Sequence, residues 1–130
     1  MTADALPPAP EIHEWAWAAA LKCPGARQVQ PFGPQFEVFK VLHKVFMMST
    51  TVRGEPIVTL KCEPELGVAL RQEHPTISPG YHMNKRHWIS LAPGPAVSSE
   101  LVGELVTNAY LLVTDALTRE QRAELRRQVS

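Results

Sequence analysis

Hydrophobic positions recur every three or four residues between residues 10 and 23, which is typical of a helix with one face on a core. Pro10 suits the first turn of such a helix, and the Pro-Gly pair at residues 24–25 ends it. The positions on the predicted core face are Ile12, Trp15, Ala16, Ala19 and Cys23. Trp17 and Leu21 fall on the opposite face. We expect residues 1–9, a loose arm rich in Ala and Pro, to cover this second face, and a small partner surface is the alternative.

The pattern then changes from helical to alternating. Residues 36–41 and 44–52 are rich in β-branched and aromatic side chains, which predicts an antiparallel hairpin. Only Leu42 and His43 separate the two strands, and because both are poor turn formers a wider turn is the alternative. An RGEP turn precedes a third predicted strand at residues 57–62.

A short helix is predicted from Pro64, with a buried stripe formed by Leu66, Ala69 and Leu70. Residues 87–91 form another predicted strand, and Ser98 or Ser99 caps the longest helix. The predicted core face of that helix consists of Leu101, Val102, Leu105, Ala109, Leu112, Val113 and Ala116. Residues 10–117 therefore form one domain, and a capping-box pattern at residues 118–121 predicts that the charged tail, residues 118–130, is a separate solvated helix.

The element order is a helix, three or four strands, a short helix, one or two strands and a long helix. Strands joined by hairpins form antiparallel sheets, and helices flanking such a run can cover one face. The predicted class is therefore α+β, an antiparallel β-sheet with helices packed on one face. The other face of the sheet is left for solvent or for a ligand.

Composition limits what this domain can bind. The 130 residues include 13 Lys or Arg and 13 Asp or Glu, so the formal net charge is zero. Strong non-specific binding of nucleic acid needs many cations, so any such binding must use a local patch and be weak. No apolar run is long enough to span a membrane, no secretory leader is evident, and we expect a cytoplasmic protein without membrane partners. Cys23 and Cys62, which lack neighbours at zinc-site spacing, should be reduced and buried.

One stretch concentrates hydrogen-bonding and aromatic side chains after a Pro-Gly turn. Its sequence, PGYHMNKRHW, spans residues 79–88, and the candidate binding residues are Tyr81, His82, Asn84, Lys85, Arg86, His87 and Trp88. Cationic and amide groups suit phosphate oxygens, and flat rings suit stacking or anchoring of the loop.

Three sequence blocks resemble the MmcQ/YjbR-like family of bacterial proteins, namely residues 31–41 (PFGPQFEVFKV), residues 60–66 (LKCEPEL) and residues 79–88. The resemblance covers about residues 11–117, and a Tyr followed by an aliphatic pair in the last long helix fits it as well. It implies a frataxin-like (CyaY-like) topology, described as a double wing, and DNA binding.

Two features depart from the family pattern. Leu42 and His43 occupy the hairpin turn, where the family usually has glycine. The tail beyond residue 117 is longer and richer in arginine than the pattern.

Catalysis and metal binding have weaker support in the sequence. His82 and His87 are five residues apart, which places them on different sides of a strand or helix and disfavours a shared metal. No nucleophile, carboxylate pair or glycine-rich phosphate loop accompanies them. We therefore expect no catalytic residues, no metal and no cofactor, and an enzyme that uses these histidines as acid and base is the least favoured alternative.

The leading hypothesis is a non-enzymatic DNA-binding protein with residues 79–88 as its recognition surface. Tyr81 and Trp88 would support the loop, and Lys85 and Arg86 would present cations. An anionic small molecule or a protein partner is the alternative. A basic face that joins the loop to Lys40, Lys44 and Lys61 would favour nucleic acid, and a closed pocket would favour a small ligand.

Overall fold

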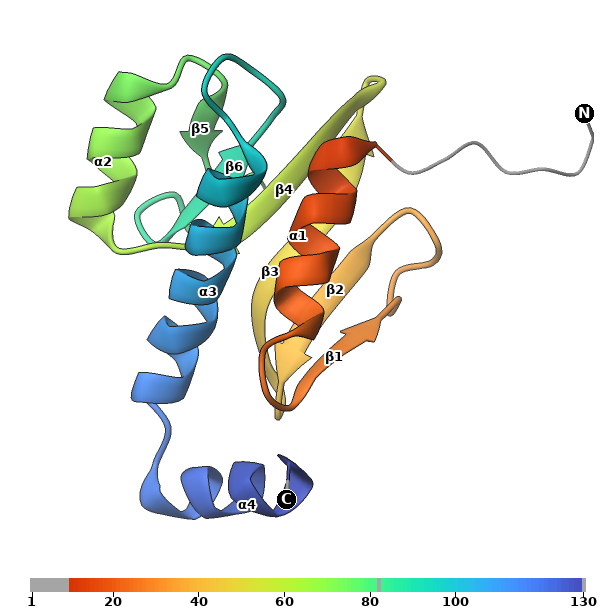
Figure 1. The fold of residues 1–130 in the computed structure, drawn as a ribbon, viewed down its shortest axis with the longest axis vertical. Coiled ribbons are helices and arrows are strands. Elements are labelled where there is room, and N and C mark those ends of the chain that lie inside the picture. Colours follow the sequence, from red (N-terminus) through yellow and green to blue (C-terminus); the bar gives the residue numbers. More distant parts are fainter. Residues whose placement is uncertain (1–9, 82, 130) are drawn as a thin grey trace, which may run out of the picture.

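The computed structural model describes residues 10–81 and 83–129 and contains one antiparallel sheet with helices (Figure 1). The strands run in the order β1-β2-β3-β4-β6-β5. The elements are α1 (Glu11–Leu21), β1 (Ala26–Val29), β2 (Glu37–Val41), β3 (Lys44–Val52), β4 (Glu55–Lys61), α2 (Pro64–Glu73), β5 (Ile77–Pro79), β6 (Trp88–Leu91), α3 (Ser99–Asp115) and α4 (Arg119–Val129). The α+β prediction is confirmed, and β1 is a strand that the sequence pattern did not delimit.

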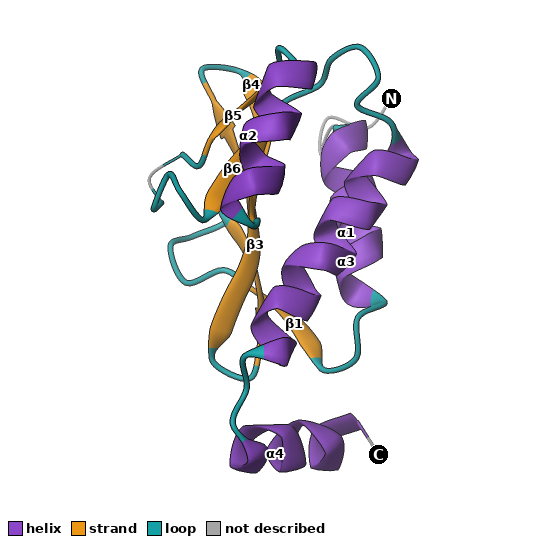
Figure 2. Cartoon of the chain, turned by 90° about the vertical axis from the view of Figure 1, so that its left-hand side faces the viewer, coloured by secondary structure: helices purple, strands orange, loops and turns teal. Residues whose placement is uncertain are grey.

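Helices α1 and α3 pack against each other and against the same face of the sheet (Figures 1 and 2). Buried apolar side chains from both layers form the core, among them Ala16, Phe39, Leu60 and Val106. Helix α2 contacts β5 and β6 at the far end of the sheet. The opposite face of the sheet is not covered by any of these helices, which is the arrangement expected from the element order (Figure 2).

Helix α1 buries a wider arc than the spacing of its apolar residues predicts. The Nε2 atom of His13 lies 3.0 Å from the Thr50 carbonyl oxygen and 3.2 Å from that of Ile57. Trp17 donates its indole N–H to the Ser49 hydroxyl at 2.8 Å and stacks on the His13 ring. The prediction that Trp17 lies on the outer face is therefore wrong, because specific hydrogen bonds satisfy the polar atoms that this arc turns towards the sheet.

Leu21 does lie on the outer face of α1, with 53% of its surface exposed. The arm proposed to cover this face, residues 1–9, lies outside the described residues.

The β2–β3 hairpin has the tight two-residue turn, with Leu42 at a positive φ of 55°. The register shifts after the Phe39–Met47 pair, so that Lys40 pairs with Val45 and Phe46 forms a bulge. Phe46 is buried and packs edge-on against Tyr110 of α3.

In α2 only Gly67 and Leu70 are buried, so the predicted stripe is wrong at Leu66 and Ala69, which are exposed. The helix turns a narrow face towards β5 and β6, and a glycine permits this approach: a Cβ on Gly67 would lie 3.3 Å from an Ile89 methyl group.

The two C-terminal helices begin as the sequence predicts. Ser98 caps α3 by accepting from the Leu101 N–H at 3.1 Å. Thr118 and Gln121 form the reciprocal capping box of α4. Leu105 is buried as predicted, whereas Leu112 is only half-buried. Among the described residues, no helix combines the length and the apolar character needed to cross a membrane.

Candidate nucleic-acid interface

The predicted recognition stretch forms the loop between β5 and β6, and it is anchored at both ends. The Gly80 N–H donates to the Trp88 carbonyl at 2.8 Å. The Tyr81 N–H donates to the Ser90 hydroxyl at 2.9 Å, and that hydroxyl lies 2.8 Å from the Thr59 hydroxyl of β4. These bonds tie the start of the loop to the centre of the sheet.

Asn84 organises the tip of this loop. Its side-chain carbonyl accepts from the Arg86 N–H at 2.9 Å and from the His87 N–H at 3.3 Å, which is an Asx-type turn. The side-chain oxygen of Asn84 is therefore used within the loop itself. The exposed side chains that this turn presents are Lys85, Arg86 and His87. The Lys85 ammonium also donates to the Gly80 carbonyl at 3.4 Å.

Tyr81 and Trp88 are both half-buried at the two ends of the loop. His82, the remaining predicted site residue, lies outside the described residues.

The strand register extends the cations of the loop across the sheet. Trp88 pairs with Lys61, and Arg27 pairs with Lys40. Paired residues share a face, and alternate residues along a strand face the same way. Lys61 therefore shares its face with Thr59, and Lys40 shares its face with Val38, on the side of the sheet away from α1 and α3.

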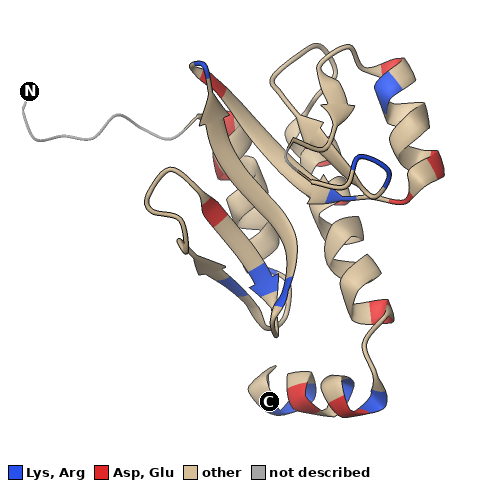
Figure 3. Ribbon diagram, turned by 180° about the vertical axis from the view of Figure 1, so that it is seen from behind, with Lys and Arg blue, Asp and Glu red and all other residues tan. Residues whose placement is uncertain are grey.

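The pairing of β3 with both of its neighbours completes this alignment. Phe39 and Leu60 both pair with Met47, and Lys40 and Lys61 are the next residues on β2 and β4, which run in the same direction. Lys40 therefore lies in the same cross-strand row as Arg27 and Lys61, although the bulge at Phe46 makes Val45 its partner on β3. Neighbouring strands are about 4.8 Å apart, so the four strand steps from Arg27 to Trp88 span about 19 Å. Lys85 and Arg86 follow just beyond Trp88. We call these five residues, Arg27, Lys40, Lys61, Lys85 and Arg86, the basic row. Figure 3 shows Lys and Arg positions at the strand ends and on the loop of this side.

Carboxylates on the strands lie away from the basic row. Glu37 pairs with Ser49 and so points to the α1 side, where Gln28 and Gln30 donate to it. Glu55 shares the open face but starts β4, six residues before Lys61 and about 20 Å away. The ion pair between Arg127 and Glu124 lies on α4, outside the basic row.

The positions of the basic row were only partly evident from sequence. Lys40 and Lys61 were candidates for a basic face, but Arg27 was not. Lys44 pairs with the buried Val41 at the hairpin end, so the register does not place it in the row. Arg27 could not be identified because its role depends on β1, which the pattern did not delimit.

A cavity of about 280 Å³ opens on the same face. It lies between the β1–β2 loop, the β5–β6 loop and the strands beneath them, and both loops project away from the helices (Figure 2). Its lining residues are Phe32, Phe36, Met48, Thr50, Thr59, Tyr81 and Met83. Of these, only Tyr81 was a candidate in the sequence.

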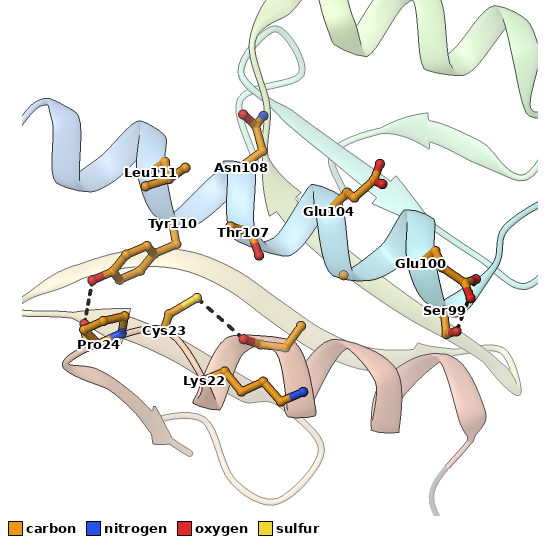
Figure 4. Close-up of a pocket in the computed structure, with 12 residues that line it drawn as sticks. Lys22, Cys23, Pro24, Ser99, Glu100, Glu104, Thr107, Asn108, Tyr110 and Leu111 are labelled. Carbon is orange, nitrogen blue, oxygen red and sulfur yellow. Dashed lines mark hydrogen bonds between the residues drawn. The ribbon is translucent and has the colours of Figure 1, made fainter.

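A larger groove of about 890 Å³ lies between α1 and α3 (Figure 4). The Tyr110 hydroxyl closes one end by donating to the Pro24 carbonyl at 2.6 Å. Burial raises the pKa of the nearby Cys23 thiol, which disfavours the reactive thiolate. Glu100 and Glu104 line the groove with Lys22 as the one cation, so this site suits phosphate less well than the open sheet face.

No group of three or more His, Cys, Asp or Glu side chains suited to a metal occurs in the described part of the chain.

Comparison with known proteins places these features in a family. A family model described as YjbR matches residues 21–112. The chain belongs to the YjbR family. This confirms the family predicted from the three sequence blocks.

The relatives span most of the chain. YbdF of Escherichia coli O157:H7 is 42% identical over 88% of this chain and 94% of its own length. YjbR of Escherichia coli K12 is 32% identical over 76% of this chain and 84% of its own length. Both are named as uncharacterized proteins.

Solved structures share the fold. The crystal structure of the Deinococcus radiodurans protein DR2400, a DUF419 domain, covers 83% of both chains with a TM-score of 0.74 and 38% identity. A Pseudomonas syringae protein covers 77% of this chain and 96% of its own with a TM-score of 0.67 and 23% identity, which is a likeness of fold alone.

Proposed function

We propose that this protein binds nucleic acid, with DNA as the first candidate, by placing the phosphate backbone along the basic row. The observation that carries the proposal is the register, which aligns Arg27, Lys40 and Lys61 across the helix-free face and continues into Lys85 and Arg86. Cations in a line suit a polymer of regularly spaced phosphates, whereas a single anion would need them to converge on one point.

The charges limit the strength of this binding. Five cations neutralise at most about five phosphates, so the slope of log affinity against log salt is at most about −4.5 for duplex DNA and about −3.5 for a single strand. The protein has no net charge to add long-range attraction. Binding is therefore weak at physiological salt and clear only at low salt. Backbone contacts of this kind do not read the base sequence.

Fluorescence anisotropy with labelled single- and double-stranded oligonucleotides, measured at several salt concentrations, tests the proposal. Lys61→Ala, Lys85→Ala and Arg86→Ala should each weaken binding similarly for all sequences. Each should also reduce the magnitude of the salt slope by about 0.7 to 0.9. Lys22→Ala is the matched control, because it removes one exposed cation at the α1 end, outside the row, and should leave the slope unchanged.

Two results would overturn the proposal. The absence of binding to either oligonucleotide at low salt, with the protein folded by circular dichroism, would leave an anionic small molecule or a protein partner as the function of this face. Binding that persists in a Lys61/Lys85/Arg86 triple variant but is lost when Arg126 and Arg127 are replaced would assign the interaction to α4 instead.

A further inference from the structure

The cavity on the open face has walls suited to a flat ring. Phe32 and Phe36 stand edge to face, with ring centroids 6.1 Å apart and planes at 83°. Phe32 is 73% exposed, which is unusual for so large an apolar side chain. Tyr81 and Met83 form the facing wall from the other loop. Aromatic and thioether groups on opposite sides of an opening favour a planar, polarisable guest.

The floor of the cavity carries hydroxyl groups. Thr50 and Thr59 come from β3 and β4, with side chains on the open face. The Thr59 hydroxyl already shares a hydrogen bond with Ser90 at 2.8 Å. A guest that fits here is therefore mostly apolar on its faces, with polar atoms on its edge that hydroxyls can reach.

Cations lie beside this cavity. Thr59 in the floor and Lys61 of the basic row are two residues apart on one strand, so their Cα atoms are about 7 Å apart. Tyr81 in the wall follows Gly80, whose carbonyl accepts from the Lys85 ammonium. The guest should therefore carry a phosphate close to its flat ring.

We infer that this cavity takes an unstacked base of a single-stranded nucleic acid while the basic row holds the adjoining phosphates. The inference rests on the proposed function and specifies its substrate class. Bases in a duplex are stacked and paired inside the helix, whereas a single strand can turn a base out onto aromatic side chains. The protein should therefore bind a single strand more tightly than its phosphate contacts alone would allow.

Three probes of equal length separate the base from the backbone. They are a thymidine dodecamer, a duplex dodecamer and a dodecamer of abasic deoxyribose phosphates, each labelled for anisotropy. Stacking of one base on an aromatic side chain contributes about 1–3 kcal/mol, which corresponds to about a five- to 150-fold change in Kd. The thymidine strand should bind more tightly than the abasic strand by a factor in this range. A uridine dodecamer distinguishes RNA from DNA as the source of the base.

Phe32→Ala tests the wall directly, and because this side chain is exposed the fold should persist. The variant should lose most of the preference for the thymidine strand and keep its affinity for the abasic strand. Phe32→Leu, which keeps an apolar side chain without a ring, should lose the same preference. Leu21→Ala, which removes an exposed apolar side chain from the outer face of α1, is the matched control and should change neither affinity.

The outcomes distinguish the two proposals. Equal affinity for the thymidine and abasic strands would overturn the base-binding inference and leave phosphate binding intact. A preference for the thymidine strand that Phe32→Ala does not reduce would also overturn it, since the base would then lie elsewhere. If no probe binds at low salt, the proposed function fails and the inference fails with it.

Discussion

Replacing Gly80 by alanine should destabilise the protein through a single steric contact at the base of the candidate interface. A Cβ at this position would lie 2.5 Å from the Trp88 Cβ and 3.0 Å from the Trp88 carbonyl carbon and oxygen. Gly80 is not among the residues with positive φ, so alanine can adopt its backbone conformation. The predicted loss of stability therefore comes from the steric contact alone and not from backbone strain.

The size of the effect follows from these distances. Carbon atoms in contact are normally about 3.5–4.0 Å apart, so Gly80 and Trp88 must separate by at least about 1 Å. Trp88 cannot move freely, because it pairs with Lys61 and its carbonyl accepts from the Gly80 N–H at 2.8 Å. Forcing an extra methyl group into such a site costs about 1–3 kcal/mol.

Urea unfolding followed by circular dichroism measures this loss, and Gly103→Ala provides the control. Gly103 lies within α3, and a Cβ there would meet nothing within 4 Å. Alanine should therefore stabilise the helix by about 0.5–1 kcal/mol. The two Gly→Ala variants should shift the unfolding midpoint in opposite directions at an unchanged m-value. A Gly80→Ala midpoint equal to or above that of the parent would refute the steric argument.

Three further predictions concern the core. Leu105→Ala should cost about 2–5 kcal/mol of unfolding free energy, and a loss below about 1 kcal/mol would contradict the placement of α3. Cys23 and Cys62 should remain reduced, since both are buried. Burial is the largest of several effects that raise the pKa of the Cys62 thiol to about 11, which disfavours the reactive thiolate. A protein mass two protons below that of a reduced control would show a disulfide instead. Burial lowers the pKa of His13 below 6.5, against smaller opposing effects of its two carbonyl partners and Glu37, so the unfolded state binds the proton more readily. The contribution of His13 to stability should therefore be full above pH 6.5 and be lost on acidification between pH 6.5 and the lowered pKa. The unfolding free energy of His13→Gln should fall less over this window than that of the parent. Equal slopes of unfolding free energy against pH in the two proteins would contradict this prediction.

Local chemistry was sufficient to predict many of the elements from sequence. The three- to four-residue period of α1, the capping box of α4 and the serine cap of α3 involve neighbours along the chain. So does the alternation of β2 and β3. The fold class followed from the order of such elements, and the helix-free face of the sheet followed from the fold class.

The tertiary structure decided which faces those elements turn to one another. The periodicity placed Trp17 on the outer face of α1, but its indole N–H donates to Ser49, which is distant in sequence. The outer position of Leu66 likewise depends on how closely α2 approaches β6. Periodicity shows that a helix has two faces, but the contact surface of the neighbouring layer determines how wide the buried face is.

The candidate interface shows the same division. The sequence by itself determined that residues 79–88 form a loop dense in donors, and that a neutral chain must concentrate its cations locally. Only the strand register, in which Phe39 and Leu60 share the partner Met47, could place Lys40 of β2 in line with Arg27 and Lys61. Such alignment is a property of pairing between distant segments, and a shift by one residue would turn these side chains to the other face. The cavity depends on the same pairing, because its walls come from two loops that only the folded sheet brings together.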